Sequence, residues 1–160
     1  MKSILTTQQP LFQLSWEDKS PFYATSLSAG FDIVCSKPVS LEPGQRVLTP
    51  TGLRILWNQP PIKMNLSDNN QIILVPELQI RPRSGLALKY GLTLLNSPCT
   101  IDADYRGEIQ LILINHGENT CDLNAGERVA QAICSFVIQL PQLEKKYVTR
   151  GVGGFGSTGV

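Results

Sequence analysis

Two carboxylates stand two residues apart in the segment Ile101–Glu108, which reads Ile-Asp-Ala-Asp-Tyr-Arg-Gly-Glu. Alternate side chains of an extended chain share a face, so Asp102 and Asp104 would point the same way if this segment were a strand. Such a pair can hold a divalent cation or activate a water molecule. Charged hairpin tips have the same composition, so the spacing alone favours an ordinary surface turn.

A second group, Arg81-Pro-Arg-Ser-Gly85, joins two arginines to a hydroxyl and a glycine. Guanidinium groups bind phosphate oxygens through paired hydrogen bonds, and glycine lets a ligand approach the main chain closely. The alternative interpretation is a solvated turn. Asp32, which follows Ala29-Gly-Phe, could be a cap, a turn residue or a metal contact. His116 stands alone beside Gly117, and we expect it to be structural.

The segment 150–160 reads Arg-Gly-Val-Gly-Gly-Phe-Gly-Ser-Thr-Gly-Val. A segment so rich in glycine cannot bury enough apolar surface to order itself, so composition favours a frayed terminus. Its backbone N–H groups, hydroxyls, guanidinium and ring are nevertheless the parts that could wrap a polyphosphate and stack on a base.

Short apolar runs bounded by turn residues recur along the chain, whereas helical periodicity is scarce. They predict an all-β domain, a sandwich or barrel. The expected strands are 11–16, 31–34, 46–48, 53–56, 72–80, 92–95, 109–114 and 129–140. We expect residues 110–114 to be covered on both faces, residues 84–89 to form one helical turn, and residues 58–70 to be an enlarged hairpin loop.

Length and composition narrow the function classes. The chain has 160 residues, which predicts one domain, and its formal net charge of +1 argues against a broad basic surface for nucleic acid. No segment reaches the length of a membrane helix, and the polar start lacks the apolar core of a signal peptide. We therefore expect a protein that is neither secreted nor bound to a membrane. Its four cysteines, which have no zinc-like spacing, should be free thiols.

The order of five segments along the chain is more informative about the protein family than any one of the segments. They are Ala29-Gly-Phe-Asp32, Arg81-Pro-Arg-Ser-Gly-Leu-Ala87, Asn96 with Ile101-Asp-Ala-Asp-Tyr-Arg-Gly107, Glu127-Arg-Val-Ala-Gln131, and Arg150-Gly-Val-Gly-Gly-Phe-Gly-Ser-Thr158. This series resembles the five ordered motifs of the trimeric dUTPases and covers almost the whole chain, residues 29–158.

The resemblance implies a jelly-roll-like β-barrel or sandwich subunit with at most one short helix, which assembles as a threefold homotrimer. Residues 1–149 would form the dUTPase β-barrel domain, and residues 150–160 its flexible glycine-rich C-terminal lid. Three active sites would lie between subunits, each drawing on all three chains. The implied reaction is Mg²⁺-assisted hydrolysis of dUTP to dUMP and pyrophosphate, which limits uracil in DNA and supplies dUMP for thymidylate synthesis. Such an enzyme is expected in the cytoplasm, or in the host nucleus or cytoplasm if the source is viral.

The resemblance also assigns roles around the nucleoside. Asp102 matches the aspartate that orients the attacking water against the α-phosphorus as general base. Tyr105 matches the tyrosine whose ring lies under the deoxyribose and leaves no room for a 2′-hydroxyl. Asn96 and the turn through Thr100 and Ile101 match the hairpin whose backbone reads the uracil edge.

The remaining assignments concern the phosphates, the metal and the lid. The implied phosphate-binding residues are Arg83, Ser84, Gly85 and Gln131. Asp32 matches the aspartate that contacts Mg²⁺ through water. The implied lid residues are Arg150, Phe155, Gly156, Ser157 and Thr158, with Phe155 over the uracil and the others around the γ-phosphate.

One departure from the family pattern and two alternatives remain. Cys99 stands where the family usually has glycine, so its side chain would either narrow the uracil hairpin or lean outwards. A dCTP deaminase of the same superfamily would need a proton-shuttling glutamate near the hairpin, and the sequence Ile-Asp-Ala-Asp-Tyr fits hydrolysis better. A catalytically silent binding module would be expected to lack Asp102, Tyr105 or the tail, and all three are present.

Overall fold

The structure is a computed structural model that describes residues 12–17, 19–58, 61–65, 71–140 and 150–156. Short strands dominate it, as the sequence predicts. The strands are β1 (Phe12–Ser15), β2 (Phe22–Tyr23), β3 (Phe31–Val34), β4 (Val39–Leu41), β5 (Arg46–Pro50), β6 (Arg54–Trp57), β7 (Ile62–Asn65), β8 (Gln71–Pro82), β9 (Leu92–Leu94), β10 (Cys99–Asp102), β11 (Gln110–Asn115), β12 (Cys121–Leu123) and β13 (Arg128–Gln139).

The single described helix, α1 (Ser84–Tyr90), contains the predicted helical turn. It ends at Gly91, which adopts the left-handed conformation (φ 66°) and donates its N–H to Ala87. Among the described residues, no helix combines the length and apolar character that crossing a bilayer requires.

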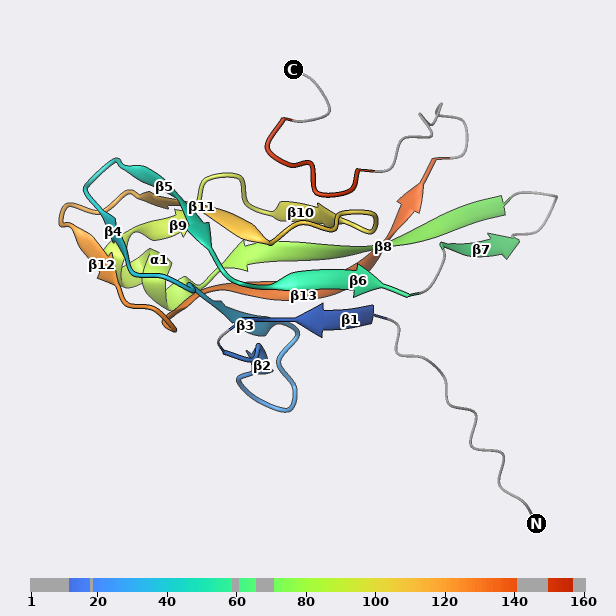
Figure 1. The fold of residues 1–160 in the computed structure, drawn as a ribbon, viewed down its shortest axis with the longest axis horizontal. Helices are drawn as coiled ribbons and strands as arrows, with labels where there is room; N and C mark the ends of the chain where they lie inside the picture. Colours follow the sequence, from blue (N-terminus) through green and yellow to red (C-terminus); the bar gives the residue numbers. More distant parts are fainter. Residues whose placement is uncertain (1–11, 18, 59–60, 66–70, 141–149, 157–160) are drawn as a thin grey trace, which may run out of the picture.

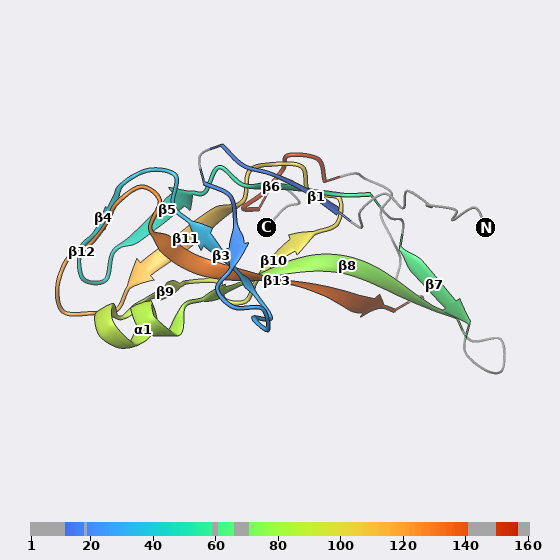
Figure 2. The same cartoon turned by 90° about the horizontal axis from the view of Figure 1, so that it is seen from below.

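The largest sheet has the strand order β10-β8-β13-β3-β2, with β7 paired to the far end of β8. A second sheet contains β5-β11-β9, and β1–β6 and β12–β4 form two further pairs. Figure 1 shows β8 and β13 running along most of the molecule. Figure 2 shows β1 and β6 on one side of the molecule and β8 and β13 on the other, so the subunit is built as two packed layers.

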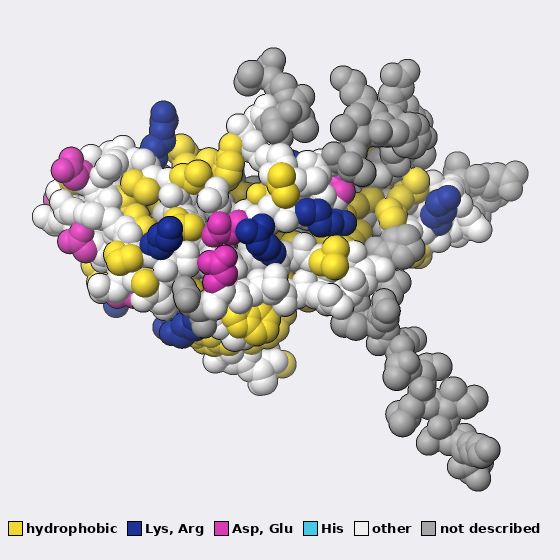
Figure 3. Space-filling view, viewed as in Figure 1, with side chains coloured by type: hydrophobic (Ala, Val, Ile, Leu, Met, Phe, Trp, Pro, Cys, Tyr) yellow, Lys and Arg dark blue, Asp and Glu magenta, His cyan; other side chains and the backbone are white. Residues whose placement is uncertain are grey.

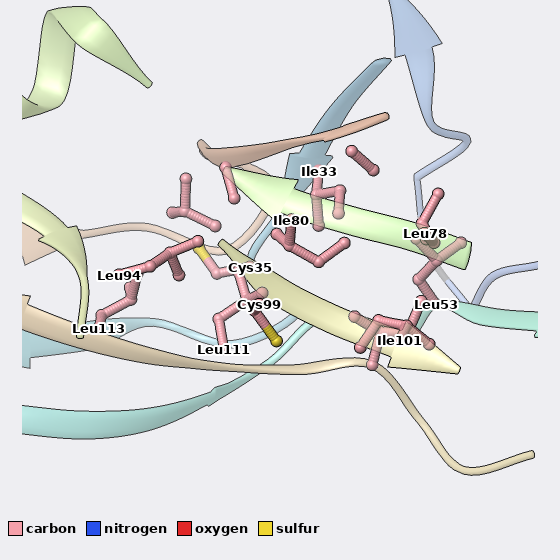
Figure 4. Close-up of a cluster of buried hydrophobic side chains, with 14 of the residues drawn as sticks. Ile33, Cys35, Leu53, Leu78, Ile80, Leu94, Cys99, Ile101, Leu111 and Leu113 are labelled. Atoms are coloured by element: carbon pink, nitrogen blue, oxygen red, sulfur yellow. The ribbon is translucent and has the colours of Figure 1, made fainter. Parts of the chain in front are cut away.

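The core lies between these layers. Ile55 on β6 and Ile33, Leu78 and Ile80 on the large sheet are all almost completely buried. Figure 4 shows Cys99 and Ile101 of β10 within the same cluster. The four cysteines are free, as expected, and burial raises the pKa of each thiol.

Opposite faces of the large sheet differ in chemistry. On one face, Ile80 lies between Ala132 of β13 and Cys99 of β10 and faces the core. On the other face, Arg81 is opposite Gln131, which is opposite Asp32 on β3. Because side chains alternate along a strand, the polar side chains of three strands share the face that turns away from the core. Positive and negative side chains are interspersed on the part of the surface that Figure 3 shows.

Two expectations about the strands need correction. The predicted loop 58–70 contains β7, which pairs with Gln71–Leu74 of β8 and extends this end of the sheet, because Ile62 and Met64 alternate with polar residues. Residues 59–60 and 66–70 lie outside the described residues. Strand β11 alternates buried and half-buried positions, so one face is fully covered in the subunit and the other only in part.

Candidate functional site

Asp32 forms the centre of a group that brings together the first, second and fourth motifs. Its Oδ1 accepts from Nε of Arg83 at 3.1 Å, and its Oδ2 accepts from Nη1 of Arg128 at 3.0 Å. Arg83 also donates through Nη1 to the main-chain carbonyl of Arg128 at 3.1 Å. We call Asp32, Arg83 and Arg128, with their neighbours Ser84, Gly85 and Gln131, the arginine cluster. Its carboxylate is only 10% exposed and is neutralised by two guanidinium groups.

A β-bulge places Arg128 in this cluster. The register between β13 and β3 shifts between Arg128 and Ala130, so one additional residue is accommodated there. As a result Val129 and Ala130 are both buried, and Arg128 points to the same face as Asp32 rather than into the core. The ring of Phe22 lies 6.0 Å from the Arg128 guanidinium carbon and supports it.

The arginine cluster borders an open hollow of about 290 Å³. Its lining includes Asp32, Arg83, Ser84, Gly85 and Gln131. The Gln131 amide donates to the carbonyl of Pro82 at 3.0 Å, which fixes its orientation. No neighbouring atom lies within 4 Å of a Cβ added at Gly85, so this glycine leaves open space beside the hollow.

Asp102 is the centre of a second group on the edge strand β10. The Arg150 guanidinium forms an ion pair with Oδ2 of Asp102, and the Arg150 N–H donates to Oδ2 of Asp104 at 3.0 Å. The Asp102 side chain is 41% exposed. Strand β10 ends at Asp102, and a turn follows, so the two carboxylates are not neighbours on one extended strand.

Tyr105 lies beside this pair. Its hydroxyl donates to the carbonyl of Glu108 at 2.8 Å, and its ring is 5.9 Å from the Arg150 guanidinium carbon. Burial raises the pKa of the Tyr105 phenol, so it remains protonated and able to donate. We call Thr100, Asp102, Tyr105, Arg150 and Phe155 the Asp102 cluster, and together they line a small hollow of about 40 Å³.

The described part of the tail contacts this cluster within the same chain. Arg106 donates its N–H to the carbonyl of Gly151 at 2.6 Å, and Tyr105 forms an isolated parallel bridge with Gly151. Arg150 also donates through Nε to the carbonyl of Gly153 at 3.2 Å. The first residues of the predicted lid are therefore held against the third motif. Ser157 and Thr158 lie outside the described residues.

Beside Asp102 a larger hollow of about 470 Å³ opens over the same polar face. Thr100 and Asp104 contribute to its wall, and so does the buried Glu77, whose Oε1 accepts from Gln79 and Ser135. Asp102 therefore has open space beside it.

Several predicted residues have other surroundings. The Ile101 side chain is buried in the core, so only its main chain can serve the site. Cys99 also packs into the core, rather than leaning outwards. Asn96 and Gly156 are exposed in turns. Neither residue lines the hollow beside the arginine cluster or the small hollow of the Asp102 cluster. His116 is exposed, and its main-chain N–H donates to Gly91, in line with a structural role.

The two clusters are separate within the chain. Along the sheet order β10-β8-β13-β3, Asp102 is opposite Glu77, whereas Asp32 is in line with Arg81. The two aspartates are three strand spacings apart across the sheet and four residues apart along the strand direction. These offsets correspond to about 20 Å between them. One subunit therefore does not bring the two carboxylates together.

The arginine cluster fits a water-mediated magnesium contact better than a direct one. No group of three metal-ligating side chains occurs within the described part of the chain. Mg²⁺ keeps several waters and takes its other ligands from one or two carboxylates and from substrate phosphates. Each Asp32 oxygen retains one acceptor position beside its arginine, and Asp32 contributes to the lining of the hollow.

Comparison with known proteins identifies the family of the chain. The family model "dUTPase" matches residues 77–159. The deoxyuridine 5′-triphosphate nucleotidohydrolase of Nautilia profundicola is 43% identical over 150 residues, covering 92% of this chain and 95% of its own. The enzyme of that name from Chlamydia pneumoniae is 46% identical over 145 residues, covering 87% and 90%.

Two solved structures show the same fold. The dUTPase of Streptococcus mutans superimposes with a TM-score of 0.59 at 28% identity, over 78% of this chain and 93% of that one. The dUTPase of Staphylococcus bacteriophage 80alpha does so with a TM-score of 0.64 at 17% identity, over 86% and 96%. On the family match and the identity to these relatives along almost its full length, the chain belongs to the dUTPase family.

Proposed function

We propose that this chain hydrolyses dUTP to dUMP and pyrophosphate by attack of water on the α-phosphorus. The observation that carries the proposal is the pair of clusters on one sheet face, built from the five family motifs in order. Relatives more than 40% identical over most of their length have the name of this enzyme. The reaction would keep uracil out of DNA and supply dUMP for thymidylate synthesis.

Asp102 acts as the general base. Its side chain is partly exposed at the end of β10 and has open space beside it, so a water molecule can lie against the carboxylate and lose its proton during attack. Arg150 is ion-paired with this carboxylate in the structure. A bound triphosphate competes for the guanidinium, and its transfer to the phosphates frees Asp102 for the water.

The arginine cluster binds the triphosphate. Arg83 uses Nε for Asp32 and Nη1 for the Arg128 carbonyl, which leaves its Nη2 for phosphate oxygens. Ser84 and Gly85 offer a hydroxyl and an open main chain beside it. Asp32 would hold Mg²⁺ through water together with the phosphates, and the ion would supply positive charge that offsets the charge on the transferring phosphoryl group.

The active enzyme is a homotrimer in which each site draws on different chains. The support is the separation of about 20 Å between Asp32 and Asp102 within one subunit. A closed ring of identical head-to-tail contacts can place the arginine cluster of one copy beside the Asp102 cluster of the next. The glycine-rich tail closes over the occupied site, with Phe155 on the uracil and with Gly156, Ser157 and Thr158 near the γ-phosphate.

Pyrophosphate release from dUTP, dTTP, dCTP and UTP, each with Mg²⁺ and with EDTA, tests the function. We expect release from dUTP alone, and only with Mg²⁺. Ammonia release from dCTP would instead identify a deaminase. No pyrophosphate from dUTP in the presence of Mg²⁺ would contradict the proposal.

A further inference from the structure

Tyr105 depends on the backbone of two following residues for its position. Its hydroxyl donates to the Glu108 carbonyl at 2.8 Å. A Cβ added at Gly107 would lie 2.4 Å from the Tyr105 oxygen and 2.6 Å from Cζ, so the ring packs directly on this glycine. Whatever fixes the backbone at Glu108 therefore also fixes the ring.

The Glu108 side chain fixes that backbone. Its Oε1 accepts from the N–H of Thr51 at 3.0 Å and from the N–H of Gly52 at 2.8 Å. Both residues belong to the connection between β5 and β6, far from Tyr105 in sequence. Hydrogen bonds to an ionised carboxylate are the stronger kind, and Glu108 satisfies two donors that would otherwise lie in a largely buried turn.

Neighbouring hydrogen bonds extend this attachment into the core. Thr51 donates through Oγ1 to the carbonyl of Ile109, and the Ile109 N–H donates to the carbonyl of Leu53 at 2.8 Å. Thr51, Leu53 and Ile109 are all buried. Glu108 thus joins the loop that carries Tyr105 to a buried part of the opposite layer.

We propose that Glu108 is a positioning residue that determines how strictly the enzyme selects the sugar. It does not touch the nucleotide. The Glu108 side chain fixes the position of the Glu108 carbonyl, and the hydrogen bond to this carbonyl fixes the Tyr105 ring. In that position the ring leaves no room for a 2′-hydroxyl. This proposal rests on the proposed hydrolysis of dUTP and on the expected place of Tyr105 under the deoxyribose.

The chemistry of the site explains why a small displacement matters. Exclusion of one hydroxyl is a steric discrimination, so the ring must not yield when a ribonucleotide enters. Positions in a site must be held within about 0.5 Å by supporting contacts to be effective. A ring fixed only by its own loop would move aside, and the ribonucleotide would then be accepted.

Four variants of the full-length protein test the proposal, by kcat/KM for dUTP and UTP and by thermal stability. Glu108→Ala removes both acceptors, whereas Glu108→Gln keeps an amide oxygen at the same place. Tyr105→Phe retains the ring and the carboxylate but removes the hydroxyl that bonds to Glu108. Glu118→Ala, at an exposed turn residue outside both clusters, is the control.

Loss of the hydrogen-bonded support should lower the dUTP:UTP ratio of kcat/KM about tenfold in Glu108→Ala and in Tyr105→Phe. Glu108→Gln should stay near the wild type, and the control should not change. A fifth variant combines Glu108→Ala with Tyr105→Phe, and the two effects should not add in it, because both changes break the same connection.

An unchanged dUTP:UTP ratio of kcat/KM in Glu108→Ala would overturn the proposal. If the melting temperature of that variant were lower, the carboxylate would only stabilise the fold. If that variant fails to fold, an unchanged ratio in Tyr105→Phe would overturn it equally. A wild-type protein that does not hydrolyse dUTP, or accepts UTP as readily, would contradict the proposed function instead.

Discussion

Arg150 and Asp102 form an ion pair that joins the beginning of the glycine-rich tail to the end of strand β10. The same arginine donates its main-chain N–H to Asp104 and lies over the Tyr105 ring. In the structure the proposed base is therefore neutralised by the residue that is expected to bind phosphate. In the proposed mechanism, substrate binding breaks this pair before Asp102 acts as the base.

Replacement of Arg150 by glutamine should leave the subunit folded but slow turnover. A preorganised donor to developing charge typically contributes about 10²–10³ in kcat. Because the described contacts of Arg150 lie at the surface, the melting temperature should change little. Steady-state kinetics on dUTP and a thermal melt check both, and full activity would exclude a phosphate-binding role.

A chain that ends at Thr149 should be a stable trimer that still binds dUMP. It loses several donors together, so we expect dUTP hydrolysis at least about a hundredfold slower than in the full chain. Normal activity of the truncated chain would mean that the tail is merely a frayed end. Failure to assemble would mean instead that the tail holds the trimer together.

Asp102→Asn should remove the general base while preserving shape. We expect kcat to fall by about 10²–10⁴, with dUTP binding and assembly nearly unchanged. Binding of a non-hydrolysable dUTP analogue, measured by calorimetry, separates the two effects. Turnover within a few-fold of wild type would contradict the assignment.

Arg128→Gln should weaken substrate binding although Arg128 is not one of the predicted phosphate ligands. It leaves the Asp32 carboxylate with one partner and lets Arg83 shift, so KM for dUTP should rise more than kcat falls. An Arg83→Ala background should remove most of this effect. Arg46→Gln, at an exposed position on β5, is the control. Equal losses with and without Arg83 would show that Arg128 acts independently.

Much of the site could be predicted from the sequence because its motifs are local. Short apolar runs bounded by turn residues located β3 to its exact bounds and found every long strand. The two-, three- and four-residue strands β2, β4, β7, β10 and β12 were missed, because such short segments are held by their partners rather than by their own pattern.

Residues that act by tertiary placement could not be identified in the same way. Arg128 joins Asp32 only because a bulge in β13 turns it outwards. Glu108 reaches Thr51 and Gly52 only because the two layers meet there. Both residues lie in segments that the sequence singled out, but neither the bulge nor the contact between layers has a signature in residue spacing.

Division of the active site between chains is the central claim, and complementation in mixed trimers tests it most directly. Arg83→Ala and Asp102→Asn chains with different tags are co-expressed, and trimers that carry both tags are purified. Each parent trimer has one defective cluster in every site, whereas mixed trimers contain some sites in which both clusters are intact. In a ring of two copies of one chain and one of the other, one of the three sites has both clusters intact, so we predict that the mixed trimers recover about a third of the wild-type rate of dUTP hydrolysis. Activity no higher than that of the two parents would contradict a site assembled from different chains.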